Sequence, residues 1–285
     1  MKHNLFRKIV LGSEVFSGSW GVKFSLKKIN EILNFAYELG VREIDTAPVY
    51  GKKNHDVEKK IGNILNKENL KYSVSTKFTV NKNLLKNRSN ILKSVKNQLE
   101  GSLRSLKTDT IDNYFFHSGT DEEFFNNDVW ELLIKKKKEG KIRNLCLSLK
   151  HDLVKKNSLK QLDFIDQYEI DKISTVCNLY SKESLKKVIP FCKNKKLLIY
   201  GRMPLAKGLL TGKYNDLSKF DKFDPRINNL QMTKKIIKFS KTIKNLSAKN
   251  SVLWSLKHCD NNATIYIYIH IFFYLIKYMY IFDVL

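Results

Sequence analysis

Glycine, proline and arginine are scarce in this sequence. It contains 12 glycines and 4 prolines in 285 residues, below the usual ~7% and ~5% of globular chains. This scarcity excludes collagen-like repeats and long Gly/Ser-rich or Pro-rich linkers. With 42% hydrophobic and 28% charged residues, the composition is that of one large globular domain, which can bury enough surface to fold without disulfides or metals.

Acidic residues are also few, but the excess positive charge does not indicate nucleic-acid binding. The formal charge is +24, from 52 basic and 28 acidic residues, and only seven of the basic residues are arginine. Proteins that read bases and phosphates favour the planar, bidentate guanidinium of arginine. We therefore assign most lysines to solvated helix surfaces, as in the run at 135–138 that ends an apparent helix, and expect no specific nucleic-acid partner.

Motifs for metal binding, redox chemistry and secretion are missing. The four cysteines (Cys146, Cys177, Cys192 and Cys259) are far apart and form no C-x-x-C pair, so we expect reduced, buried thiols and no metal site. The first residues, MKHNLFRK, lead into no apolar core of a secretory signal. A cytoplasmic protein is the simplest expectation.

Short β-rich runs alternate with amphipathic helical stretches along almost the whole chain, as in βα units with a parallel sheet. Eight such units in a chain of this size predict an α/β fold of the (β/α)₈ TIM-barrel type. A doubly wound sheet is the alternative, but no G-x-G-x-x-G or G-x-x-x-x-G-K-[ST] is present. The predicted strands are 16–20, 41–47, 72–78, 110–117, 142–149, 174–179, 197–205 and 263–269.

Helix boundaries can be placed from capping residues. Ser25 is expected to cap a helix that Gly40 ends, and Ser89 is expected to cap a later one. Gly140 follows a helix that begins near Asp128.

Polar side chains follow apolar runs at three predicted strand ends, where a barrel places its active site. The second strand ends in I-D-T-A-P-V-Y-G, which carries Asp45 and Tyr50, the third ends with Lys77 in V-S-T-K-F, and His117 ends the fourth. An ammonium beside a phenol favours the phenolate and lowers its pKa from about 10. A carboxylate would keep a buried lysine charged, and a histidine can polarise a carbonyl oxygen. The four residues therefore form a plausible acid and oxyanion site for carbonyl reduction, although each alone is more often structural.

The same segments resemble the aldo-keto reductase family. I-D-T-A-P-V-Y-G, S-T-K and F-H-S match the family's Asp, Tyr, Lys and His tetrad, and the resemblance covers about residues 11–265. It continues through G-S-W-G at 18–21, E-G-K-I-R at 139–143 and P-L-A-K-G-L-L-T-G-K-Y at 204–214.

The resemblance implies a barrel oxidoreductase that reduces an aldehyde or ketone with hydride from NADPH and without a metal. Tyr50 would donate the proton, Lys77 and Asp45 would tune it, and His117 would seat the carbonyl. Backbone N–H groups of the segment 204–212 would lie near the cofactor pyrophosphate. The implied cofactor-binding residues are Trp20, Asp45, Ser148, Ser174, Arg202, Pro204, Leu205, Gly208, Leu210 and Gly212.

Three positions near the expected nicotinamide site depart from the family pattern. Leu149 stands where the family usually has Asn, and Ser174 stands where it has Gln. Both changes remove a side-chain amide that would orient the cofactor. Arg202 replaces a Tyr that often stacks on the nicotinamide, which we interpret as a subgroup feature.

The C-terminal end also departs from the family, so the barrel could be incomplete there. We therefore divide the chain into a reductase domain at 1–265 and an atypical apolar tail at 266–285, which contains no arginine and one lysine. A membrane tail anchor is the least favoured explanation, because His270, Lys277 and Asp283 interrupt the segment. The others are a final strand and helix that close the barrel, and a frameshift that replaced the family's ending, which we favour.

Two further functions stay open beside the reductase. Leu149 and Ser174 fit a weak or inactive reductase-like protein, which would bind the cofactor or have a regulatory role. The net charge of +24 leaves open a protein that binds nucleic acid or an anionic membrane. Its affinity for duplex DNA would then fall steeply as the salt concentration rises. For the reductase we expect a small carbonyl compound as the partner and no membrane association.

Overall fold

The computed structural model describes residues 6–18, 23–156, 158–218, 220 and 224–259 and the backbone of the strand at 264–268. Within these residues the chain alternates strands and helices from the first strand to the last. The expected βα pattern is therefore present.

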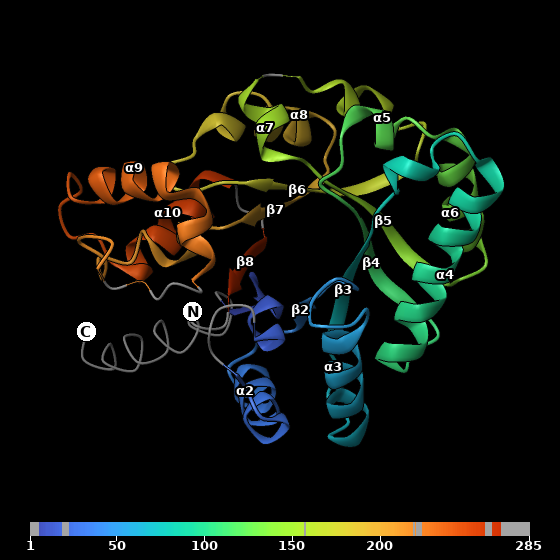
Figure 1. The fold of residues 1–285 in the computed structure, drawn as a ribbon, viewed down its shortest axis with the longest axis horizontal. Helices are drawn as coiled ribbons and strands as arrows, with labels where there is room; N and C mark the ends of the chain where they lie inside the picture. Colours follow the sequence, from blue (N-terminus) through green and yellow to red (C-terminus); the bar gives the residue numbers. More distant parts are fainter. Residues whose placement is uncertain are drawn as a thin grey trace.

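Eight parallel strands follow one another around a closed barrel in sequence order, and β8 pairs with both β7 and β1 (Figure 1). Consecutive parallel strands require a crossover on the outside, so this order places the helices around the barrel. The fold is thus the predicted (β/α)₈ barrel. The strands are β1 (Ile9–Gly12), β2 (Glu43–Asp45), β3 (Ser73–Phe78), β4 (Ile111–His117), β5 (Ile142–Ser148), β6 (Ile170–Val176), β7 (Leu198–Arg202) and β8 (Thr264–Tyr268).

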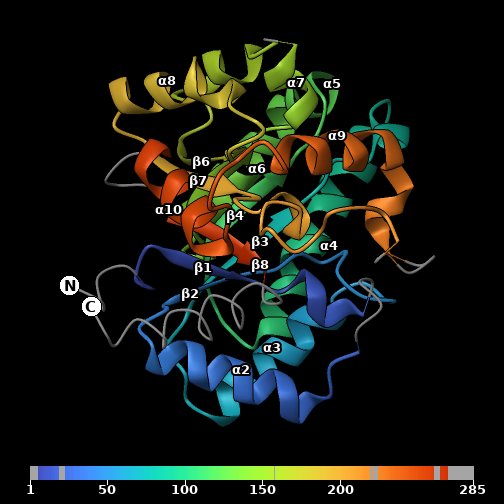
Figure 2. The same ribbon diagram turned by 90° about the vertical axis from the view of Figure 1, so that its left-hand side faces the viewer.

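Helices cover the outside of the barrel, with α2 and α3 on one side and α7 and α8 on the opposite side (Figure 2). Each pair of consecutive strands is joined through at least one helix. They are α2 (Leu26–Glu38), α3 (Asp56–Lys67), α4 (Arg88–Leu106), α5 (Asp121–Phe124), α6 (Asn127–Lys138), α7 (His151–Lys155), α8 (Val188–Asn194), α9 (Leu230–Ser240) and α10 (Ala248–Cys259).

Side chains alternate between the two faces of the strands, as the pleat requires. Val10, Phe115, Cys146 and Tyr200 from four different strands form a small cluster of their own, separate from the main core. That cluster lies inside the barrel, because it joins strands that are not neighbours in the sheet. The much larger core lies between the strands and the surrounding helices.

An aromatic group dominates the outer core beside β4. The Trp130 indole stacks on Tyr168 at a centroid distance of 5.0 Å and donates to the Phe124 carbonyl at 2.8 Å. Phe78 and Phe116 pack edge-on or tilted against the same indole. These contacts fix α6 against the strands that end at the candidate site.

The first predicted strand was placed wrongly. The residues at 14–17 form a 3₁₀ helix, and the strand is the preceding run Ile9–Gly12. Its residues are fully buried, and Gly18 then ends the short helix at φ 80°. The sixth strand also begins four residues earlier than predicted, at Ile170.

Three of the expected helix boundaries are confirmed and one is wrong. Gly40 follows the end of α2 with a positive φ of 99°. Ser25 caps α2 by accepting from the Lys28 N–H at 3.1 Å, and Gly140 follows α6. The cap of α4 is Asn87, whose side chain accepts from the Asn90 N–H at 3.0 Å. Ser89 lies inside that helix because the Asn87 side chain occupies the capping position first.

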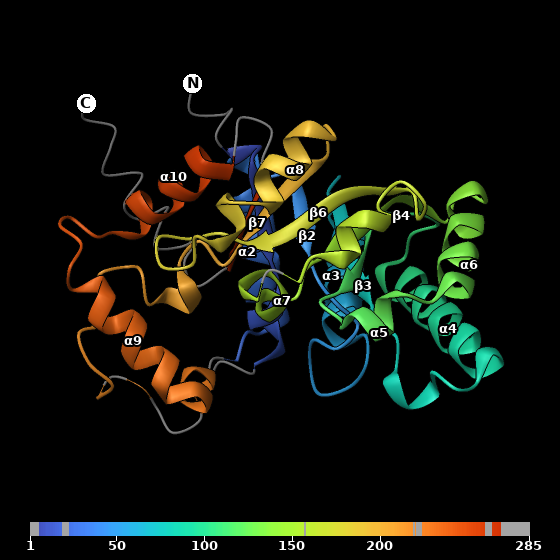
Figure 3. The same cartoon turned by 90° about the horizontal axis from the view of Figure 1, so that it is seen from above.

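A satellite core lies beside the main barrel. The loop after β7 contributes Ala206, Leu209 and Leu210, which pack with Ile236 and Ile237 of α9. Helix α9 stands outward from the barrel in Figure 3. The loop at 204–212 is therefore stabilised by packing against the apolar face of α9.

The strand β8 crosses the boundary that we placed at residue 265. It pairs with β1 from Ile9↔Ile265 to Gly12↔Tyr268. A final strand therefore closes the barrel, as one of the three explanations of the tail predicted. Residues 269–285, and Trp20, lie outside the described residues. Among the helices that are described, none is long and apolar enough to cross a membrane.

Helix α3 packs so closely on the end of α4 that Gly62 has no room for a side chain. A Cβ there would lie 2.3 Å from the Ser105 carbonyl oxygen. We expect Gly62→Ala to destabilise the protein by about 1–3 kcal/mol, although alanine favours an isolated helix by about 1 kcal/mol. Urea unfolding measures the change. The control Asn63→Ala, at an exposed position of the same helix, should stay within about 0.5 kcal/mol, and a stabilised Gly62→Ala would contradict the packing.

Candidate functional site

A buried ion pair lies where β2 and β3 end. The Lys77 Nζ donates to both Asp45 carboxylate oxygens, at 2.7 and 2.8 Å, and to the Thr46 carbonyl at 2.5 Å. Lys77 is 5% exposed and Asp45 is 8% exposed. Asp45 and Thr46 thus offer the buried ammonium three acceptors, one for each of its N–H bonds.

Tyr50 and His117 complete the set that the sequence predicted. The Lys77 Nζ lies 3.3 Å from the Tyr50 hydroxyl, and the His117 ring lies edge-on to the Tyr50 ring at 6.5 Å between centroids. Tyr50 comes from the loop after β2, and His117 is the last residue of β4. The fold therefore brings all four residues to one end of the barrel.

The charges of this site are strongly influenced by burial. Burial raises the pKa of Asp45 and lowers the pKa of Lys77, and the contact between the two opposes both shifts. The pKa of His117 falls to about 3 because of burial and the nearby cations Lys77 and Arg202. His117 is consequently a neutral imidazole at physiological pH, able to donate or accept a hydrogen bond without adding charge.

Three serines lie beside the tetrad at the ends of β4, β5 and β6. The Ser118 and Ser148 hydroxyls are 2.9 Å apart, and Ser148 is paired in register with Ser174. Ser174 is 1% exposed, and its hydroxyl has no hydrogen-bond partner among the described residues. A buried, unsatisfied hydroxyl fits a polar ligand group at this position.

Arg202 at the end of β7 reaches across to the end of β5. Its guanidinium donates to the Leu149 carbonyl at 2.5 Å and to the Ser118 hydroxyl at 3.2 Å. The Leu149 side chain is 1% exposed and belongs to the outer core. The Arg202 guanidinium thus lies at the end of β5, next to Leu149, the residue for which the family resemblance implies an asparagine.

The segment Pro204–Gly212 was expected to offer backbone N–H groups to a pyrophosphate. Four of these groups already donate within the loop: Ala206 to Met203, Gly208 and Leu210 to Leu205, and Leu209 to Ala206. Arg226 lies against the same loop and donates to the Lys207 carbonyl at 3.2 Å. This cation was missed from the sequence, where only the D-P-R tripeptide at 224–226 could have marked it.

A second polar network, also missed, occupies the interior of the barrel below the tetrad. Glu43 accepts from the Ser75 hydroxyl, from Asn113 at 2.9 Å and from the Tyr200 hydroxyl at 3.0 Å. Lys172 donates to the same Tyr200 hydroxyl at 3.3 Å. Burial raises the pKa of Glu43 to about 7, despite these hydrogen bonds and the charge of Lys172.

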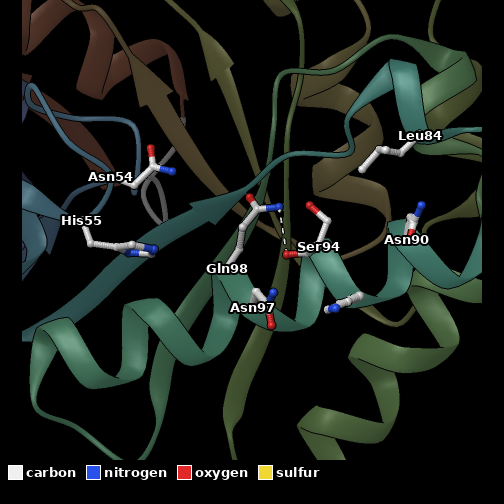
Figure 4. Close-up of a pocket in the computed structure, with 8 residues that line it drawn as sticks. Asn54, His55, Leu84, Asn90, Ser94, Asn97 and Gln98 are labelled. Atoms are coloured by element: carbon white, nitrogen blue, oxygen red, sulfur yellow. Dashed lines mark hydrogen bonds between the residues drawn. The ribbon is translucent and has the colours of Figure 1, made fainter.

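One pocket outside the tetrad is shallow and polar. It holds about 440 Å³ between the β2–α3 loop and α4, and amide side chains dominate its wall (Figure 4). Elsewhere, all four cysteines are free and buried as predicted. Among the described residues no cluster of His, Cys, Asp and Glu forms a metal site.

Comparisons with known proteins identify the family to which this barrel belongs. The Aldo/keto reductase family model matches residues 8–267. The chain belongs to this family. The predicted family and fold are therefore confirmed.

Several relatives can be compared with the chain directly. The aldo-keto reductase YhdN of Bacillus subtilis is 30% identical over 77% of this chain and 64% of its own length. The NADH-specific methylglyoxal reductase of Escherichia coli is 26% identical, over 62% of this chain and 56% of its own length. The chain thus spans less than two thirds of these curated relatives.

Solved structures give the same fold. A glycerol dehydrogenase from Gluconobacter oxydans superposes with a TM-score of 0.69 and 25% identity, over 91% of this chain and 82% of its own. An aldo-keto reductase from Bacillus halodurans in its holo form reaches a TM-score of 0.65 at 20% identity, over the same shares of the two chains.

The raised pKa of Glu43 makes stability depend on pH. Between its ordinary pKa of 4.5 and about 7, the folded protein holds a proton that the unfolded chain has lost. The free energy of unfolding therefore falls as pH rises through this window. Replacing the carboxyl by an amide in Glu43→Gln removes this contribution.

We expect the stability difference between wild type and Glu43→Gln to change by about 2–3 kcal/mol from pH 5 to pH 8, to the disadvantage of the wild type. Urea unfolding at both pH values tests this. Glu122→Gln, at a largely exposed position, serves as the control. An identical difference at both pH values would show that Glu43 titrates normally.

Proposed function

We propose that the protein reduces an aldehyde or ketone to an alcohol, with Tyr50 as proton donor and NADPH as cofactor. The contact of Lys77 with both Asp45 and the Tyr50 hydroxyl carries this proposal. An ammonium beside a phenol stabilises the phenolate, which allows the phenol to act as an acid near neutral pH. The family membership supports the same reaction class.

The proposed mechanism uses the charge distribution of the site. Tyr50 gives its proton to the carbonyl oxygen, and the Lys77 ammonium stabilises the phenolate that remains. Asp45 holds Lys77 charged and in place. His117, neutral because its pKa is about 3, orients the carbonyl by an N–H donor. Together these donors stabilise negative charge as it forms on the oxygen.

The cofactor, when bound, supplies the hydride. We propose that Ser148 and Ser174 face its nicotinamide end, since the unsatisfied Ser174 hydroxyl is available there. Arg202 and the residues Pro204, Leu205, Gly208, Leu210 and Gly212 would follow along its length. Trp20 and Asp45 complete the proposed set.

NADPH is proposed over NADH from the family resemblance, and direct binding measurement decides between them. Quenching of protein fluorescence by each cofactor should give a lower Kd for NADPH. One of the relatives is NADH-specific by name, so tighter binding of NADH would reassign the cofactor without removing the reductase function.

The role of Tyr50 can be tested by a single substitution. Tyr50→Phe removes the transferable proton but keeps the ring, so kcat should fall by about 10²–10⁴-fold while the Kd for NADPH is unchanged. We suggest a panel of small aldehydes that includes methylglyoxal, followed by cofactor absorbance. Full activity in the variant would reject Tyr50 as the proton donor.

A second function is favoured by one observation. Leu149 buries its side chain and Ser174 is short, so the side-chain amides that would orient a nicotinamide are absent at both positions. A cofactor-binding protein with little or no catalytic activity would bind NADPH tightly and turn over none of the panel. We also propose a cytoplasmic location, which fractionation of cells would test.

A further inference from the structure

The loop that carries Tyr50 is fastened at its far end by His55. The Nδ1 atom of the His55 ring lies 2.5 Å from a carboxylate oxygen of Glu58. The backbone N–H of His55 donates to the Pro48 carbonyl at 2.7 Å. The Val57 N–H donates to the Tyr50 carbonyl at 3.3 Å. The first turn of α3 and the Tyr50 loop are thus one hydrogen-bonded unit.

The second oxygen of the same carboxylate binds the barrel. Glu58 accepts from the Thr76 hydroxyl at 2.6 Å, and both side chains are 0% exposed. Thr76 precedes Lys77 in β3, and neighbouring residues of a strand point to opposite faces. Glu58 therefore holds the outer face of β3 one residue away from the lysine whose ammonium lies 3.3 Å from the Tyr50 hydroxyl.

Helix α4 closes this arrangement from the other side. A Cβ at Gly101 would lie 2.4 Å from the His55 Nε2, so the imidazole packs directly on the helix backbone. Figure 4 shows the ring beside α4 at the margin of the polar pocket. The imidazole is therefore enclosed between Glu58 and α4.

We propose that Glu58 is a positioning residue, which fixes the Tyr50 hydroxyl against the Lys77 ammonium by binding the Tyr50 loop through His55 and β3 through Thr76. This inference rests on the proposed reductase function. Glu58 touches neither reacting group in the described contacts and acts through the loop and the strand. A shift of about 1 Å between two reacting groups is enough to cost about 10²-fold in rate.

The experiment compares Glu58→Gln with Glu68→Gln, a matched change just after the other end of α3. We expect Glu58→Gln to lower kcat at least tenfold, with the Kd for NADPH within twofold of wild type. Thr76→Val, which removes one of the two anchors at similar volume, should lower kcat in the same direction. Glu68→Gln should leave both values unchanged.

A second readout does not need turnover. The ionisation of Tyr50 is isolated by ultraviolet difference titration of each protein against the same protein carrying Tyr50→Phe. Loosening the loop weakens the ammonium contact, so Tyr50 in Glu58→Gln and Thr76→Val should ionise at higher pH than in wild type. A stability loss alone would not move this titration.

The outcomes separate the two proposals. An unchanged Tyr50 titration in folded Glu58→Gln and Thr76→Val overturns the positioning role, whatever the activity. A shifted titration in a protein that reduces no carbonyl supports the positioning role and rejects the reductase function. If Glu58→Gln does not fold, Thr76→Val alone decides.

Discussion

The candidate site depends on the buried ion pair between Asp45 and Lys77. Isolated charges at this depth would be strongly unfavourable, and removing one partner of a buried pair typically costs about 3–5 kcal/mol. The pair is possible because parallel register places Asp45 beside Ser75, so that Lys77, two residues further along β3, points into the same end of the barrel. The ammonium donates a hydrogen bond to Tyr50. Burial keeps His117 neutral by lowering its pKa, and the charges of Lys77 and Arg202 add to this shift.

The barrel interior continues this electrostatic pattern in a second layer. Because side chains alternate along a strand, Glu43 and Asp45 share the inner face of β2. Glu43 contacts Tyr200 from a strand on the other side of the barrel, and Lys172 completes the group. Each layer thus combines one carboxylate, one lysine and one tyrosine. Only the upper layer lies at the strand ends, where a substrate could meet it.

The sequence was sufficient to predict the barrel and the meeting of the tetrad, because strand ends can be recognised as polar residues after apolar runs. The first strand was missed because it has only four residues, and the aromatic segment at 16–20 that follows was taken for the strand instead. Ser118, Glu43 and Glu58 were missed for another reason: apart from His55, three residues before Glu58, their partners are 18 to 157 residues away. No periodicity relates positions so far apart. The cap of α4 was misplaced by two residues, since Asn and Ser cap about equally well.

Two departures from the family pattern form one structural feature. Leu149 directs its side chain into the outer core and leaves only its carbonyl at the end of β5, and that carbonyl accepts from Arg202. The same guanidinium binds Ser118, next to His117, and helps to lower the pKa of that histidine. Arg202 thus connects the ends of β4, β5 and β7 and brings a positive charge to the edge of the site.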